Sequence, residues 1–280
     1  MTALLLACAL AWCGGEAADT VLAMRPGDRV VVRNIAGAVS VEAGADDHME
    51  VSEGGRADRV AVRRSGGRVI VGGSDTRRGD RFVELSIRLP DWVDVEIEGR
   101  RLDVSVRGMA GSVDVRNISG DVEVVGARGP VRVNTVQGEI RVDDATGSLT
   151  LSTKTDDIRV RGATGPVEAR TVSGDVRLDA IRSERVRGEV QAGDIRFSGE
   201  ILAGGAYRFF LHSGDARLVL SPNPSARVRV STFHGTFESD FPVKVSEFTS
   251  GRSFEFTLGG GDAEVIVEAF DGEIQLLQGG

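Results

Sequence analysis

Two columns of charged residues are the first feature of the sequence that could carry chemistry. An acid follows alternate glycines of a regular series, and a basic residue stands two places further on. The acids are Asp121, Glu139, Asp157, Asp175, Asp194 and Asp215; Glu123 opens the second column, which continues with Arg141, Arg159, Arg177, Arg196 and Arg217. Rows of carboxylates can bind Ca²⁺ or supply the acid and base of a glycosidase. Because each acid here has arginines beside it, the pattern instead favours a solvated face whose charges neutralise one another.

Calcium-binding β-rolls have a similar nine-residue period, G-G-x-G-x-D-x-U-x, but this sequence departs from it. Each unit has one glycine, and its aspartate follows at once and only in alternate half-turns. No turn clusters the six to eight oxygen ligands that Ca²⁺ takes. The left-handed hexapeptide solenoid is also excluded, because the apolar pattern repeats every nine residues. We expect no metal, no cofactor and no catalytic residue.

Three further sets of residues are candidates for binding or catalysis. Asn117, Thr135, Thr153 and Thr171 form a column that could face an ordered surface, although threonine is also a common strand residue. The histidines are His48, His212 and His234, of which the last two are expected in successive turns without metal-ligand spacing. The aromatic residues Tyr207, Phe209, Phe210, Phe233 and Phe237 lie with His234 in longer units after Ser183, and we expect core and cap positions for them. No P-loop, dinucleotide, H-E-x-x-H or G-x-S-x-G motif is present.

The elements that position these residues follow from the glycine period. Counting from Gly111, glycine recurs every nine residues to Gly174, and Asp156 occupies the only missed step. Apolar residues stand two and four places after each glycine, as in Val122 and Val124, which is the period of a short strand with one buried face. The seventh place alternates between Ile118, Val136, Lys154, Val172 and the small residues Ala127, Ala145, Ala163, so the full repeat is eighteen residues. Such strands can bury that face only by stacking, which predicts an all-β, parallel β-solenoid with about 18 to 21 residues per turn.

The repeat changes toward both ends of the chain. Glycines at Gly193, Gly214 and Gly235 continue it with longer steps, so we expect successive turns there. Before Gly111 the alternation is looser and interrupted by turns, which predicts an N-terminal β cap or meander over residues 19–97. We expect the solenoid over residues 98–280. The cap should form one continuous domain with it, because an uncapped end would expose unpaired strand edges.

The first eighteen residues resemble an export leader. An apolar run, MTALLLACALAW, gives way to the small residues GGEAADT. Cleavage near Ala17 or Ala18 is one expectation, and a lipid anchor at Cys13 or Cys8 is the alternative; a buried N-terminal helix is a third. Both cysteines lie in this segment, so the folded body has none for a disulfide or a thiolate metal site. The run is too short to span a bilayer, and we expect no transmembrane span in the mature chain.

Composition agrees with an all-β protein. The 280 residues include 37 glycines, only 7 prolines and 38 valines, a mixture that favours strands and frequent turns. The formal net charge is −8, so the chain lacks the cationic face that would neutralise phosphates, and no nucleic-acid partner is expected.

The segments GDRVVVRNIAGAVSVEAG, LPDWVDVEI, ISGDVEV, VQGEIRV, VSGDVRL and GGGDAEVIVEAFDGEIQL together resemble the bacterial "putative adhesin" β-solenoid domain family, of unknown function. The resemblance covers roughly residues 20 to 280. It implies a noncatalytic cell-envelope protein outside the cytoplasm, a structural or binding solenoid with a link to envelope-stress regulation. An envelope protein or a surface polysaccharide is then the expected partner. The alternative is a polysaccharide-active solenoid enzyme, a lyase or glycosidase, because some parallel solenoids have those activities.

Overall fold

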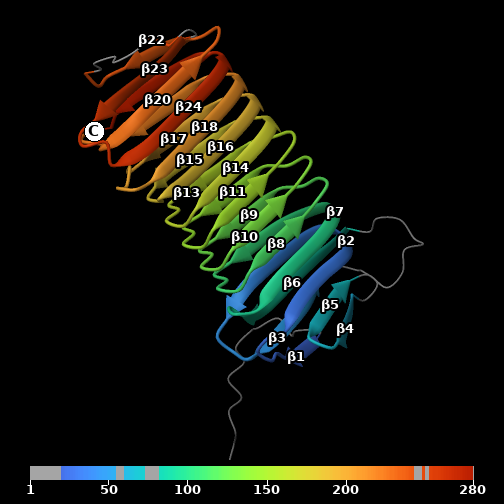
Figure 1. Ribbon diagram of the computed structural model, residues 1–280. Coiled ribbons are helices and arrows are strands. Elements are labelled where there is room, and N and C mark those ends of the chain that lie inside the picture. Colours follow the sequence, from blue (N-terminus) through green and yellow to red (C-terminus); the bar gives the residue numbers. More distant parts are fainter. Residues whose placement is uncertain (1–19, 55–59, 73–81, 243–247, 250–251, 280) are drawn as a thin grey trace, which may run out of the picture.

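The computed structural model describes residues 20–54, 60–72, 82–242, 248–249 and 252–279, and all regular secondary structure in them is β-strand. The strands form one long stack, with the N-terminal strands at one end and the C-terminal strands toward the other (Figure 1). The predicted leader with Cys8 and Cys13 lies outside the described residues. Among the residues described, no helix has the length and apolarity to cross a membrane. The predicted all-β parallel solenoid is confirmed.

The middle of the stack consists of two rows of parallel strands, one strand of each row per turn. Row one contains β8 (Val113–Arg116), β10 (Val131–Asn134), β12 (Leu149–Ser152), β14 (Val167–Ser173), β16 (Arg185–Ala192) and β18 (Ala206–Ser213). Row two contains β9 (Val122–Val125), β11 (Ile140–Asp143), β13 (Ile158–Arg161), β15 (Val176–Ile181), β17 (Ile195–Gly199) and β19 (Ala216–Leu220). Val113, Val131 and Leu149 are direct partners in the ladder, so the register repeats every eighteen residues as predicted.

Alternation along each strand puts one face of every strand into a continuous apolar core. The predicted inward residues are all buried to 1% exposure or less: Val122, Val124, Ile140, Val142, Ile158, Val160, Val176 and Leu178. The small residues Ala127, Ala145 and Ala163 are also buried, at the corner where row two returns to row one. At the opposite corner, the large residues Ile118, Val136 and Val172 are exposed.

The glycine period has a steric cause at the corner that leads into row two. Gly120, Gly138 and Gly174 take φ values of 111°, 123° and 141°, a region that side chains disfavour. A Cβ placed on Gly138 would lie 2.1 Å from the carbonyl oxygen of Gly120 in the preceding turn. Asp156, at the missed step of the period, adopts the same backbone conformation with φ 119°. The close approach of successive turns therefore favours glycine at this corner. Asp156 is the exception, and its backbone is strained because a non-glycine residue has a positive φ there.

The N-terminal segment both caps the stack and contributes turns to it. Its strands are β1 (Thr20–Ala23), β2 (Arg29–Gly44), β3 (His48–Gly54), β4 (Ala61–Ser65), β5 (Arg68–Gly72), β6 (Phe82–Pro90) and β7 (Asp94–Arg107). β2 pairs in parallel with β7 on one side and with β5 and β6 on the other. β3 and β4 close this end as antiparallel partners of β6 and β5, and β1 pairs with β3. Parallel stacking therefore starts at β2, and the boundary predicted at residue 97 falls within β7.

The C-terminal end has a different strand order from the one expected. Its strands are β20 (Ala226–Thr232), β21 (Thr236–Ser239), β22 (Phe248–Thr249), β23 (Arg252–Leu258), β24 (Ala263–Asp271) and β25 (Glu273–Gln278). β24 pairs with both β18 and β20, and β25 pairs with both β19 and β21. The expectation that Gly235 follows Gly214 in the next turn is thus wrong, because the turn containing Gly272 lies between them. The chain builds its outermost turn, returns through antiparallel β23, and inserts its last strands one layer inward.

Candidate functional site: the charged lattice and its surroundings

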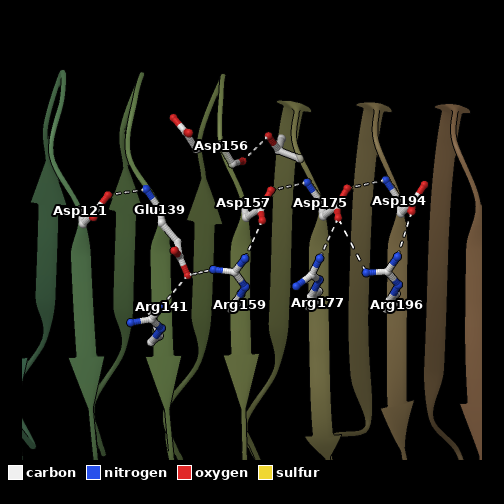
Figure 2. Close-up of polar contacts among 11 residues, drawn as sticks. Asp121, Glu139, Arg141, Asp156, Asp157, Arg159, Asp175, Arg177, Asp194 and Arg196 are labelled. Carbon is white, nitrogen blue, oxygen red and sulfur yellow. Dashed lines mark hydrogen bonds and ion pairs between the residues drawn. The ribbon is translucent and has the colours of Figure 1, made fainter.

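The acidic column stands where row two begins, and its aspartates connect the turns through the backbone. The carboxylate of Asp157 accepts the N–H of Asp175 at 2.9 Å, and Asp175 accepts that of Asp194 at 3.1 Å (Figure 2). The same kind of bond joins other turns and extends past both ends of the column: Asp103 to Asp121, Asp121 to Glu139, Asp194 to Asp215 and Asp215 to Glu273. Each of these aspartates therefore uses one carboxylate oxygen to accept a backbone N–H of the neighbouring turn. This structural role could not be seen in the sequence pattern.

In Asp157, Asp175 and Asp194 the other carboxylate oxygen pairs with the arginine column, as predicted. Arg159, Arg177 and Arg196 each contact the aspartate two residues earlier on their own strand, at 2.8, 3.1 and 3.2 Å. Diagonal contacts join the turns, since Arg196 also approaches Asp175 at 3.9 Å and Arg159 bonds to Glu139 (Figure 2). The hydrogen bond that Arg159 donates to Glu139, together with nearby carboxylates, raises the pKa of Arg159 despite partial burial. We call this array of paired acids and arginines the charged lattice.

The carboxylates of the charged lattice bond mainly to groups of the protein itself. Its side chains are partly exposed, and pairs of this kind contribute about 0 to 1 kcal/mol each in water. In the part of the chain that the structure describes, no group of three or more His, Cys, Asp or Glu residues is placed to hold a metal ion. The geometry suits a rigid, soluble face whose carboxylates are held by backbone N–H groups and arginines.

The threonine column lies inside the corner, so its predicted alternative as a surface ladder is wrong. Asn117, Thr135, Thr153 and Thr171 are exposed by 6% or less. Thr135 donates its hydroxyl to the carbonyl oxygen of Gln137 at 2.9 Å, and Thr171 donates to that of Asp156 at 3.1 Å. These buried hydroxyls are thus satisfied by carbonyl oxygens of the turn.

The aromatic residues of the longer units divide into core and surface. Tyr207 and Phe209 are fully buried as predicted. The Tyr207 hydroxyl donates to the backbone carbonyl oxygen of Ser183 at 2.7 Å. Burial is the main cause of the raised pKa of Tyr207. The prediction of a core or cap position for Phe233 is wrong. This side chain is 62% exposed and stacks on Phe270 with ring centroids 5.1 Å apart.

The three histidines do not come together. His48 contacts Glu50 at 3.1 Å near the N-terminal end. His212 stacks on Phe270, and His234 meets the same ring edge-on. The expectation of His212 and His234 in successive turns is wrong, because β24 lies between their strands and carries Phe270.

A cavity of about 280 Å³ lies near the C-terminal end, among Gly205, Arg227, Glu255, Asp262 and Glu264. Its acidic side chains already have partners. Glu255 pairs with Arg229 at 3.3 Å and Glu264 with Arg208 at 2.8 Å, while Asp262 accepts a hydrogen bond from Ser225 at 2.6 Å. Each of these acidic side chains is therefore already bonded to a neighbouring residue.

These features define a protein class, the parallel β-solenoids with short turns and antiparallel end caps. Within it, residues 31–277 match the family model described as Toastrack DUF4097, and the chain belongs to that family, whose function is unknown. The resemblance seen in the repeated segments is thereby confirmed. A search of the curated proteins finds no match. The solved structures include a putative cell adhesion protein from Clostridium sporogenes at 10% identity and a TM-score of 0.27, covering 93% of this chain and 98% of that one, which is too weak a likeness to carry an argument.

Proposed function

We propose that the protein is a noncatalytic element of the bacterial cell envelope, exported from the cytoplasm, whose rigid solenoid serves as a structural or binding surface. The observation that supports this most is the occupation of the charged lattice. Its aspartates bond to the backbone of the next turn and its arginines bond to those aspartates, so the repeated carboxylates stabilise the stack. A catalytic carboxylate needs a setting different from that of its neighbours, and here Asp157, Asp175 and Asp194 each bond to a backbone N–H and to an arginine.

The shape of the middle turns supports the same reading. Between Val113 and Leu178 each row repeats with an eighteen-residue register, and the corners consist of a few residues. Short corners leave little chain to form the walls of a substrate cleft. A stiff rod with uniform faces instead suits contact along its length or at its ends. Export is inferred from the apolar leader, and the link to envelope-stress regulation from the family resemblance alone.

Fractionation of the native host tests the location directly. We expect the protein in the envelope or extracellular fraction, with a mature N-terminus near Ala17 or Ala18, or a lipidated cysteine at position 8 or 13. Deleting residues 1–18 should leave a folded, cytoplasmic β-protein that no longer supports the cellular role. Normal behaviour of the leaderless form from the cytoplasm would overturn the proposal.

Degradation assays test the absence of catalysis. Acidic and neutral polysaccharides incubated with the purified protein should keep their length, as measured by reducing ends and by absorbance of unsaturated products. Asp175→Asn serves as the matched variant, because it changes one lattice carboxylate. Cleavage by the wild type that is lost in this variant would establish the alternative, a polysaccharide-active enzyme.

A further inference from the structure

One corner of the solenoid carries a straight row of exposed side chains, one per turn, which we call the corner ladder. Strand register places its members side by side: Ile118, Val136, Lys154, Val172, Gln191, His212, Phe270 and Phe233. With strands about 4.8 Å apart, these eight positions extend over roughly 34 Å along the stack. The sequence signal for it was present, because the seventh place of alternate units is large rather than alanine.

Exposed apolar side chains are concentrated on the corner ladder. The structure describes six exposed large hydrophobic residues, and five of them belong to this row: Ile118 at 49%, Val136 at 37%, Val172 at 44%, Phe233 at 62% and Phe270 at 45%. The sixth, Val21, lies on β1 at the N-terminal end. Scattered exposed hydrophobics are ordinary on protein surfaces, but a row of them along one edge indicates an interaction site.

A second column beside the first six residues of the corner ladder is neutral and, apart from Ala192, polar. Its members follow the ladder residues in sequence: Ser119, Gln137, Thr155, Ser173, Ala192 and Ser213. The hydroxyls of Ser119 and Thr155 donate to carbonyl oxygens of the preceding turn, at 3.2 and 3.1 Å, and keep their acceptor capacity. From Ile118 to Ser213 the two columns contain a single charged side chain, Lys154, whereas the adjoining face carries the charged lattice.

We propose that the corner ladder binds a neutral, extended, β-linked polysaccharide lying along the solenoid axis; this rests on the proposed function and names its ligand class. The sugar rings of such a chain present apolar C–H faces and polar hydroxyl edges, which match one apolar and one polar column. Each sugar advances the chain by about one strand spacing, so successive rings meet successive turns. An uncharged ligand also suits two columns with almost no charge on a protein of net charge −8.

Other occupants fit this corner less well. An extended peptide binds best to an unpaired strand edge, but the backbone here is bonded from turn to turn. A second copy would face this one with the same negative net charge, across a row of five apolar side chains that is narrower than a stable interface. An anionic membrane is repelled by the same charge.

Calorimetric titration with cellohexaose and with chitohexaose tests the proposal on the purified full chain. Val136→Thr combined with Val172→Thr keeps the branched shape of each side chain and replaces a methyl by a hydroxyl. We expect affinity to fall about tenfold from the lost apolar contact. Val21→Thr is the matched control, since it makes the same change at the exposed valine off the ladder, and its affinity should equal that of the wild type.

Lys154→Val gives an opposite and more specific result. It completes the apolar row between Val136 and Val172, so affinity for the neutral oligosaccharides should rise about three- to tenfold. Weaker binding in this variant, together with stronger wild-type binding to oligogalacturonate, would show that the ligand is anionic and overturn the proposal.

No binding of either neutral oligosaccharide, or equal affinity in the double variant, also overturns it. Ladder-dependent binding to phosphatidylglycerol vesicles, or ladder-dependent dimers in light scattering, would identify a membrane or a second copy instead. Fractionation of the native host separates the two hypotheses. A wild-type protein that reaches the envelope but binds neither sugar leaves the proposed function standing and removes only this ligand.

Discussion

The middle of the solenoid and its two ends are built from the same kind of turn but connected differently. In the middle, each strand pairs with the strands one turn before and after it, 18 to 21 residues away, as Val131 does with Val113 and Leu149. At the C-terminal end, Tyr207 pairs with Val265, and β24 then separates β18 from β20. The N-terminal end shows the same arrangement, because β2 lies between β7 and the strands β5 and β6. The first and last parallel turns of the chain are therefore each inserted second from an end.

This difference separates two tasks that a repeat protein must perform. Local pairing lets the middle grow by copying one unit, since each turn needs only its neighbours. A stack that ended in this way would expose its last turn to fraying and its edge to other chains. Inserting a distant segment beneath the outermost turn holds both terminal layers, and the antiparallel strands β4 and β23 then cover β5 and β20. The ends are thus closed by non-local contacts that the middle does not need.

Two deletions of equal length test this contrast with the largest expected effect. Removing residues 263–280 eliminates β24 and β25, which separates the outermost turn from the rest of the stack. We expect β18 to β23 to lose protection from hydrogen exchange and the protein to aggregate. Removing residues 131–148 takes out one whole turn but keeps the register, because Leu149 can then pair with Val113. That variant should stay soluble, with a thermal midpoint within about 5 °C of the wild type.

The reverse outcome would contradict the contrast between middle and ends. If the C-terminal deletion unfolds at the same temperature as the wild type while the middle deletion aggregates, stability resides in an uninterrupted middle. Far-UV circular dichroism of both variants, with a leaderless wild type beside them, provides the comparison.

Glycine substitutions sharpen the comparison at single positions. Gly138→Ala introduces a Cβ at a positive φ, against the backbone of the preceding turn, so we expect unfolding free energy to fall by at least about 3 kcal/mol. Gly66→Ala changes the turn between β4 and β5, where φ is 60° and no atom lies within 4 Å of the added carbon. That variant should lose only about 1 kcal/mol. Urea denaturation measures both, and equal losses would show that turn spacing does not select glycine in the middle.

Asp156→Gly is expected to stabilise the protein by up to about 1 kcal/mol. The substitution relieves a non-glycine residue at φ 119°, and it gives up the hydrogen bond from the Gly138 N–H to the Asp156 carboxylate at 2.9 Å. Asp143→Gly is the control, because it makes the same change within β11 and should destabilise by about 1 kcal/mol. A lower stability in Asp156→Gly would mean that the carboxylate bond outweighs the backbone strain.

The middle of the molecule could be predicted from sequence because its information is local. The glycine period and the two-residue alternation identified the register, the buried valines and the outward lattice, since each depends on the turns next to it. The C-terminal order could not be predicted in this way. The spacing of Gly214 and Gly235 suggests that they lie in neighbouring turns. Nothing in residues 226–239 indicates that β24, a later segment, pairs with β18 in place of β20.

The candidate surfaces were predicted unevenly for a related reason. Charge alternation is visible in sequence, so the ion pairs of the lattice were expected. The inward position of Thr135 and the outward position of Val136 depend on how the corner turns, and residue type favours the opposite assignment. Phe233 is exposed because of the same corner geometry. Its position was harder to predict, because β20, which precedes it, pairs with β24 and not with β18.

The smallest expected effect concerns Asp94, which joins the inserted β2 to the regular turns. Its carboxylate accepts hydrogen bonds from the Ser112 N–H at 2.9 Å and hydroxyl at 2.6 Å, and contacts Arg29 of β2 at 3.2 Å. Burial raises the pKa of Asp94, but the bonds from Ser112 and Arg29 outweigh it and hold the pKa below the usual value of 3.8. Because the folded pKa is the lower one, the ionised group stabilises the fold above pH 3.8, and this contribution is lost as pH falls through the folded pKa.

Asp94→Asn should therefore be less stable than the wild type at pH 7 by no more than about 1 kcal/mol, since the side chain is 39% exposed. The difference should shrink as pH is lowered below 3.8, and urea denaturation at a series of pH values measures it. Ser112→Ala removes one hydroxyl donor and should move the loss of stability to higher pH, toward the unperturbed value. A difference between wild type and Asp94→Asn that stays constant from pH 7 to pH 3 would mean that the carboxylate charge does not help to join β2 to the stack.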